Sequence, residues 1–130
     1  MNRVVLDASA LLAVFFEEPG ADMVAPVLYG ATVSAVNYSE VLKKSLERRG
    51  NFEMTQSLLS RQALQIIPFD TERATAAAAM FSLTKTLGLS FADRACVSLG
   101  AELGYEVLTA EKRMSLTGMN VAVRLIRNAN

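Results

Sequence analysis

The sequence predicts an α/β fold with a central, mainly parallel sheet flanked by helices in three layers. Short apolar runs alternate with longer helical segments along the chain, which is the order of elements in parallel α/β proteins. The first run, Arg3–Asp7, has three successive apolar residues at its centre, as expected of a strand buried on both faces. The 130 residues, 52% of them hydrophobic, suffice for one domain with a substantial core. We therefore expect a single domain over residues 1–130.

Glycine and proline mark where the elements of the first half end. The segment Glu17–Gly20, which contains Pro19, stops a first helix, and Gly30 and Gly50 follow two later ones. Pro68 places the third strand at a sheet edge or gives it an early end. After the first strand, the expected elements are helix Ala8–Phe16, helix Ala21–Tyr29, strand Ala31–Ser34, helix Val36–Arg49, helix Phe52–Gln65 and strand Ile66–Phe69.

Capping signals define the second half. Asp70 is a typical N-cap for a long Ala-rich helix that ends at Gly88, and Ser90 opens the next helix, which Gly104 ends. The expected elements are helix Thr71–Leu87, helix Ser90–Leu103, strand Tyr105–Thr109, a short helix Glu111–Leu116, strand Asn120–Ile126 and a loose tail, Arg127–Asn130.

Composition removes several classes of function. The chain has no histidine, which excludes a Ser-His-Asp triad, imidazole acid–base pairs and His-ligated zinc. The single cysteine, Cys96, excludes an internal disulfide and a multi-cysteine zinc cage. No apolar run approaches the length of a membrane span and no signal peptide is evident, so we expect a cytoplasmic protein with no membrane partner. The net charge of zero does not by itself indicate nucleic-acid binding.

Four acids are expected near the carboxyl edge of the predicted sheet, where ligands bind in such folds. Asp7 ends the first strand and Glu111 follows the strand Tyr105–Thr109. Glu40 and Asp93 lie near the starts of two helices. Carboxylates that converge repel one another, and a bound cation relieves the repulsion. Oxygen ligands without His or Cys favour Mg²⁺ or Mn²⁺, which can polarise a phosphodiester and activate water.

Each acid also has an ordinary structural explanation, which is the commoner one for any of them taken singly. Asp7 suits a helix N-cap, and Ser90 with Asp93 forms a capping-box pattern. Glu40 and Glu111 suit the positive end of a helix dipole. It is the set of four that points to a metal site.

Polar and basic side chains accompany the four acids. Ser9, Asn37 and Thr109 are expected to support the carboxylates by hydrogen bonds, although turn chemistry explains Ser9 and Thr109 as well. Arg94 adjoins Asp93 and is the first candidate for contact with RNA phosphates. Further candidates are Lys43 on the third helix and Lys112 with its neighbour Arg113, for which a solvated surface is an equally good explanation.

Four motifs resemble those of the PIN-domain family, in the family's order and across essentially the whole chain. They are Val4–Leu12, Ser34–Val41, Leu89–Cys96 and Leu108–Lys112. A chain of this length looks most similar to a VapC-type toxin of a toxin–antitoxin pair.

The resemblance implies a Mg²⁺- or Mn²⁺-dependent endoribonuclease that cleaves tRNA or rRNA, a homodimer, and inhibition by a VapB-like antitoxin. It implies catalytic roles for Asp7, Glu40, Asp93 and Glu111, the first three as metal ligands. Glu111 departs from the family pattern, which more often has Asp at the fourth position. We expect water activated by the metal to attack the phosphorus and leave a 5′-phosphate and a 3′-hydroxyl.

Three alternatives stay open at this stage. The chain can be a non-toxin RNA-processing nuclease, or a PIN domain that binds without cutting. It can also be a non-catalytic Mg²⁺-binding signalling module that resembles a receiver domain, although Asp70 suits a helix cap better than a phosphoacceptor.

Overall fold

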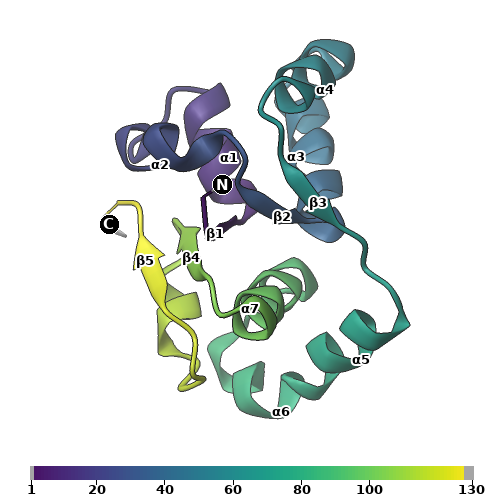
Figure 1. Ribbon diagram of the computed structural model, residues 1–130, viewed down its shortest axis with the longest axis vertical. Helices are drawn as coiled ribbons and strands as arrows, with labels where there is room; N and C mark the ends of the chain where they lie inside the picture. Colours follow the sequence, from purple (N-terminus) through teal and green to yellow (C-terminus); the bar gives the residue numbers. More distant parts are fainter. Residues whose placement is uncertain (1, 128–130) are drawn as a thin grey trace.

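Short segments of three or four residues form the strands of a five-stranded sheet. The computed structural model describes residues 2–127, and in it the strands are ordered β3-β2-β1-β4-β5 (Figure 1). All four neighbouring pairs are parallel. The strands are β1 (Val4–Leu6), β2 (Thr32–Ser34), β3 (Gln65–Ile67), β4 (Glu106–Thr109) and β5 (Val123–Leu125).

Helices connect every pair of successive strands except the last, which the 3₁₀ turn η2 joins. The helical elements are α1 (Ala8–Phe15), α2 (Ala21–Leu28), α3 (Ala35–Glu47), α4 (Phe52–Ser60), α5 (Thr71–Ala79), α6 (Phe81–Thr84), η1 (Lys85–Leu87), α7 (Phe91–Leu103) and η2 (Lys112–Leu116). The predicted α/β fold is therefore confirmed. None of the helices between residues 2 and 127 combines the length and apolarity of a membrane span.

Strand side chains alternate between two hydrophobic cores, one on each face of the sheet. Leu6 and Leu108 point to the core that α1 to α4 complete. Val5 and Val107 point to the opposite core, which contains Cys96 of α7 and Met80, the residue between α5 and α6. Figure 1 shows the same layers, with α1 to α4 above the sheet and α5 to α7 below it. Helices thus cover both faces, as a buried parallel sheet requires.

The predicted long helix Thr71–Leu87 is wrong in one respect, because it is broken into α5, α6 and η1. The break turns Met80 and Thr84, both almost fully buried, towards the core. The Thr84 hydroxyl donates to the Met80 carbonyl at 2.9 Å, a back-bond that bends helices. Asp70 caps α5 as predicted, by accepting from the Arg73 amide at 3.0 Å.

Other boundaries shift by a few residues for identifiable reasons. The helix predicted to reach Gln65 ends at Ser60, because Gln65 belongs to β3 and donates its amide to the Ala31 carbonyl at 2.8 Å. The third strand ends just before Pro68 and lies at the sheet edge, as its proline predicted. The last predicted strand shortens to β5, and residues 128–130 of the predicted tail lie outside the described residues.

Candidate metal and catalytic site

Asp7 lies where β1 passes into α1 and is the most enclosed of the four predicted acids. Its Oδ1 accepts from the Ala10 amide at 2.9 Å and from the Ser9 hydroxyl at 2.7 Å, so Asp7 caps α1 as its sequence position predicted. Its Oδ2 accepts from the Thr109 hydroxyl at 2.5 Å. Thr109 ends the neighbouring strand β4, and the two predicted supporting hydroxyls thus both contact this carboxylate.

Burial makes the charged form of Asp7 costly. Only 4% of the surface of Asp7 is exposed to solvent. Loss of hydration raises the pKa of Asp7 from 3.8 to about 6, against the lowering effect of the hydrogen bonds from Thr109, Ser9 and Ala10, and the nearby charge of Asp93 raises the pKa further. Near neutral pH this carboxylate is thus ionised at a substantial energetic cost, which a bound cation would offset.

Asp93 lies in the first turn of α7, where its cap role is also confirmed. Its Oδ2 accepts from the Ser90 amide at 3.0 Å, while its own amide donates to the Ser90 hydroxyl at 3.1 Å, which completes the predicted capping box. This reciprocal bond fixes the carboxylate at the amino end of α7. The charge of Asp93 acts on Asp7, which directly follows the end of β1, so the first turn of α7 lies near the carboxyl edge of the sheet.

Asn37 connects the amino ends of α3 and α7. Its Nδ2 donates to the Ala92 carbonyl at 3.2 Å, so the helix that holds Glu40 is tied to the helix that holds Asp93. The Asn37 side chain is 1% exposed, and its Oδ1 finds no hydrogen-bond partner among residues 2–127. A buried carbonyl oxygen without a donor is unfavourable, and a water molecule or another ligand at this point would satisfy it.

Glu40 is the least constrained of the first three acids. It is partly exposed, and its only ion pair among the described residues is a loose one with Lys44 at 3.8 Å, one turn further along α3. A contact of this kind at the surface contributes little energy and leaves the carboxylate free to move.

Cys96 shows that Asp7, Glu40 and Asp93 share one neighbourhood. The thiol is fully buried on α7, and burial is the main reason why its pKa is well above the usual value. The charges of Asp7, Asp93 and Glu40 raise it further. Three acids that are far apart in the sequence thus act on one thiol. Cys96 lies three residues after Asp93. This spacing places both side chains on one face of a helix, so the sequence alone indicates that they are neighbours.

Glu111 faces another side chain instead. Both of its carboxylate oxygens accept hydrogen bonds from Arg113, at 2.8 Å from Nε and 3.0 Å from Nη2. This pairing lowers the pKa of Glu111. The sequence does not indicate this pair, because side chains two residues apart at the start of a helix such as η2 do not normally face each other.

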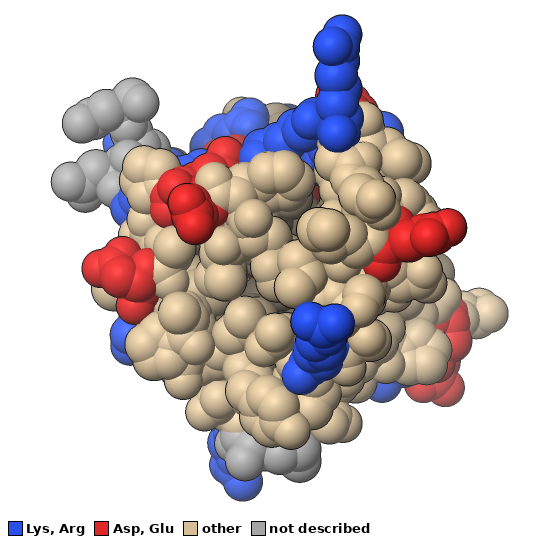
Figure 2. Space-filling model, turned by 90° about the horizontal axis from the view of Figure 1, so that it is seen from above, with Lys and Arg blue, Asp and Glu red and all other residues tan. Residues whose placement is uncertain are grey.

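The basic side chains that were predicted to contact phosphates differ in whether they are bound within the fold or exposed to solvent. Arg94 donates from Nη1 to the Leu89 carbonyl at 2.9 Å and its guanidinium lies over the Phe81 ring at 5.5 Å, so it holds α7 to α6. Lys43 and Lys112 are exposed. On the face seen in Figure 2, charged side chains are scattered in small groups and uncharged ones cover most of the surface.

The residues fit a hydrated divalent ion better than a closed cage of ligands. Between residues 2 and 127, no group of three or more His, Cys, Asp or Glu side chains is arranged to hold a metal ion. Mg²⁺ needs only one or two carboxylates, because it keeps several of its waters. The desolvated Asp7, the adjacent Asp93 and the unsatisfied Asn37 oxygen are suitable partners for such an ion and its waters. The metal site itself stays a prediction.

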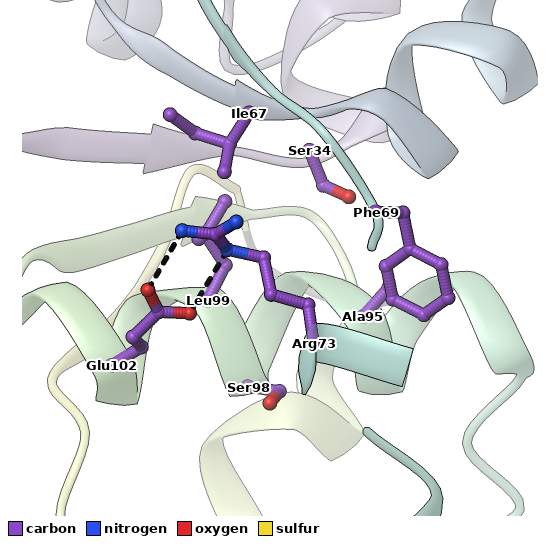
Figure 3. A pocket seen from close by; sticks show the side chains of 8 residues that line it. All are labelled: Ser34, Ile67, Phe69, Arg73, Ala95, Ser98, Leu99 and Glu102. Atoms are coloured by element: carbon purple, nitrogen blue, oxygen red, sulfur yellow. Dashed lines mark hydrogen bonds and ion pairs between the residues drawn. The ribbon is translucent and has the colours of Figure 1, made fainter. Parts of the chain in front are cut away.

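A small cavity between α5, α7 and the strands β2 and β3 is lined by none of the four acids. Arg73 and Glu102 form a double hydrogen bond across it, at 3.1 and 3.0 Å (Figure 3). This pair occupies the polar groups that a ligand would use, so we assign the cavity to packing between α5 and α7. Its lining consists of Ser34, Ile67, Phe69, Arg73, Ala95, Ser98, Leu99 and Glu102.

Sequence comparison gives one family. A family profile described as PIN domain matches residues 4–118. A search among curated proteins by sequence found no match.

Several solved structures have the same fold across almost their whole length. A toxin–antitoxin complex from Klebsiella pneumoniae has a TM-score of 0.74 at 17% identity, over 97% of this chain and 99% of that one. The DNA-bound VapBC complex of Salmonella typhimurium gives 0.75 at 15% identity, over 98% and 100%. VapC20 of Mycobacterium tuberculosis, described as a toxin that cleaves the sarcin–ricin loop, gives 0.73 at 13% identity, over 89% and 95%.

Proposed function

Because the chain belongs to the PIN-domain family, we propose that it is a Mg²⁺- or Mn²⁺-dependent endoribonuclease and the toxin of a VapBC-type pair. The observation that carries the proposal is that Asp7, Glu40 and Asp93 lie close enough for their charges to act on the same buried thiol, Cys96, while Asn37 ties the helix of Glu40 to the helix of Asp93. Carboxylates in one neighbourhood, one of them desolvated, attract a hard divalent cation. Residues 1–130 then form one PIN domain that works in the cytoplasm.

In this proposal Asp7 and Asp93 are the principal metal ligands and Glu40 the third. The bound ion would supply an activated water nucleophile and neutralise charge on the phosphate. Ser9 and Thr109 orient Asp7 through their hydroxyl groups. Asn37 holds the amino ends of α3 and α7 together, and its free Oδ1 accepts from a water in the site.

RNA is the proposed substrate, and rRNA is the first one to test. One protein of the same fold is described as cleaving the sarcin–ricin loop, and tRNA is the second candidate. Lys43 and Lys112 are exposed cations that can contact phosphates, whereas Arg94 is engaged within the fold. We also propose a VapB-like antitoxin as a partner, since similar structures were solved as toxin–antitoxin complexes. The homodimer is proposed from the resemblance of the sequence motifs alone.

Replacing Asp93 by Asn tests the catalytic assignment. Asn can still accept the Ser90 amide at the cap, so the fold should be kept while one ligand charge is lost. We expect cleavage of total RNA in Mg²⁺ or Mn²⁺ to fall by about 100-fold or more. Mapping the ends should find 5′-phosphates and 3′-hydroxyls in the wild-type reaction only.

Asp70→Asn is the matched control, because Asp70 also caps a helix but its carboxylate pairs with Arg73 at the surface. It should cleave like the wild type. Full cleavage by a pure Asp93→Asn preparation would remove Asp93 from the catalytic set.

A processing nuclease without a toxic role is the second candidate. The net charge of the chain is zero, and on the face seen in Figure 2 the Lys and Arg side chains do not form one broad basic surface. Induced expression of the wild type and of Asp93→Asn separates the two functions. Growth arrest by the wild type alone supports the toxin, and normal growth with RNA cleavage in vitro supports processing.

A further inference from the structure

Both carboxylate oxygens of Glu111 are held by one neighbouring residue. Oε1 accepts from the Arg113 amide at 3.0 Å and from its Nε at 2.8 Å, and Oε2 accepts from Nη2 at 3.0 Å. Two parallel bonds of this kind are the strongest arrangement of an arginine with a carboxylate. The negative charge of Glu111 is thus already neutralised within the chain, which reduces its attraction for a cation.

Arg113 uses its remaining end to hold the turn before α7. Nη1 donates to the carbonyls of Leu87 and Gly88, at 3.3 and 3.2 Å. Gly88 has a φ of 70°, and a side-chain carbon at this position would lie 3.0 Å from Nη1. The positive φ therefore favours glycine here, and a side chain at this position would also displace the guanidinium by a few tenths of an ångström.

The contacts of Arg113 lie near the residues that support Asp93 and near those that support Asp7. Gly88 is two residues before Ser90, the cap that holds the Asp93 carboxylate. On the other side, Glu111 is two residues after Thr109, which holds the Asp7 carboxylate and accepts the Glu111 amide at 2.9 Å. A short segment after β4 therefore contacts the supports of two acids that are 86 residues apart in the sequence.

We propose that Glu111 is a positioning residue and not a metal ligand, and that Glu111 and Arg113 form a latch that joins the loop after β4 to the turn before α7. The latch sets Asp93 at a fixed place relative to Asp7. This inference rests on the proposed metal-dependent function of the other three acids. The length of the Glu111 side chain suits this role, because Asp at position 111 would draw the guanidinium back by about one methylene and away from the Leu87 and Gly88 carbonyls.

The latch and a direct ligand predict different metal affinities in the same variants. A latch is broken equally by Glu111→Gln, Glu111→Asp and Arg113→Ala, and the double variant Glu111→Gln/Arg113→Ala should be no worse than either single one. A direct ligand would tolerate Glu111→Asp, which keeps a carboxylate. Arg113→Ala would then leave the affinity unchanged or raise it, because it frees Glu111 to bind the ion.

Calorimetric titration of the full chain with Mn²⁺ alone measures this difference. We expect each latch variant to bind Mn²⁺ about tenfold more weakly, the usual effect of removing a residue that orients a ligand. Arg124→Ala is the control, because Arg124 forms a similar exposed ion pair with Glu106 at 3.2 Å, at the amino end of β4 and away from the acids. It should bind Mn²⁺ like the wild type.

A measurement on the metal-free protein provides a second test. Exchange of the Ser90 and Asp93 amide protons should be faster in Arg113→Ala and unchanged in Arg124→Ala, because the latch supports their capping box. Unchanged exchange in Arg113→Ala would overturn the latch, and so would full Mn²⁺ affinity in Glu111→Asp. Asp93→Asn separates the two proposals: wild-type Mn²⁺ binding in that variant would overturn the proposed function itself.

Discussion

At the scale of single residues, Asp7 combines an observed structural role with a proposed functional one. It caps α1 and accepts three hydrogen bonds, yet its burial raises its pKa to about 6. The folded state therefore binds a proton at Asp7 more tightly than the unfolded state, whose pKa is near 3.8. A structure built for stability alone would be better served by a neutral side chain here.

The stability of the metal-free protein should depend on pH through Asp7. The stabilising effect of the raised pKa is complete below about pH 4 and is lost as the pH rises through about 6. A difference of about two pKa units corresponds to at most about 3 kcal/mol at pH 8. Asp7→Asn avoids this loss while it keeps the cap.

We expect Asp7→Asn to be more stable than the wild type by about 1–3 kcal/mol in urea unfolding at pH 8 without metal, with the difference shrinking towards pH 4. Asp22→Asn, at an exposed position of α2, should change stability little at either pH. If Asp7→Asn were no more stable than the wild type at pH 8, or if its gain in stability were larger at pH 4, the claim that Asp7 is ionised and buried would be contradicted.

At the scale of elements, local sequence signals specified most of the fold. The apolar runs of β1 and β4, the Asp70 and Ser90 caps and the glycines after α7 and η1 all give correct starts or ends. The sequence did not reveal the break at Met80, because an Ala-rich segment favours a continuous helix and only the core required the bend. The end of α4 was likewise set by pairing of Gln65 with the sheet.

The connection from α4 to β3 contains a residue in an unfavourable conformation. Ala63 has a φ of 50°, in the left-handed region. A side-chain carbon causes strain in this region, and glycine, which has none, avoids it. We expect Ala63→Gly to stabilise the protein by about 0.5–1 kcal/mol in thermal unfolding. The matched control Ala76→Gly, in the middle of α5, should destabilise it by about 1 kcal/mol.

Equal destabilisation by Ala63→Gly and Ala76→Gly would show that backbone entropy dominates at both positions. It would then contradict the assigned strain at Ala63.

At the scale of the whole molecule, parallel strands bring distant acids to one edge. Asp7 and Glu111 were predictable there, because each follows a strand end, and Asp93 was predictable from its helix start. The partners of these acids were not predictable in full. Thr109 was expected to support the carboxylates and does so at Asp7, whereas the bond from Arg113 to the Gly88 carbonyl joins segments that only the fold brings together.

A bound divalent ion should stabilise the folded protein in a pH-dependent way. Mn²⁺ at 100 times its Kd adds about 2.7 kcal/mol, which raises the melting temperature by roughly 10 °C for a chain of this size. The increase should be smaller at pH 5, because the proton on Asp7 competes with the ion below about pH 6. Equal increases at pH 5 and pH 8, or an equal increase in Asp93→Asn, would mean that the ion binds elsewhere.

The location of a bound Mn²⁺ in a crystal tests the central claim most directly. Anomalous scattering from a crystal grown with Mn²⁺ identifies the ion without reference to activity. We predict a peak beside Asp7 and Asp93, in contact with one of these carboxylates directly and with the other directly or through one water, while Glu111 stays on Arg113. A saturated crystal with no peak there, or with the ion bound at another surface, would contradict the account.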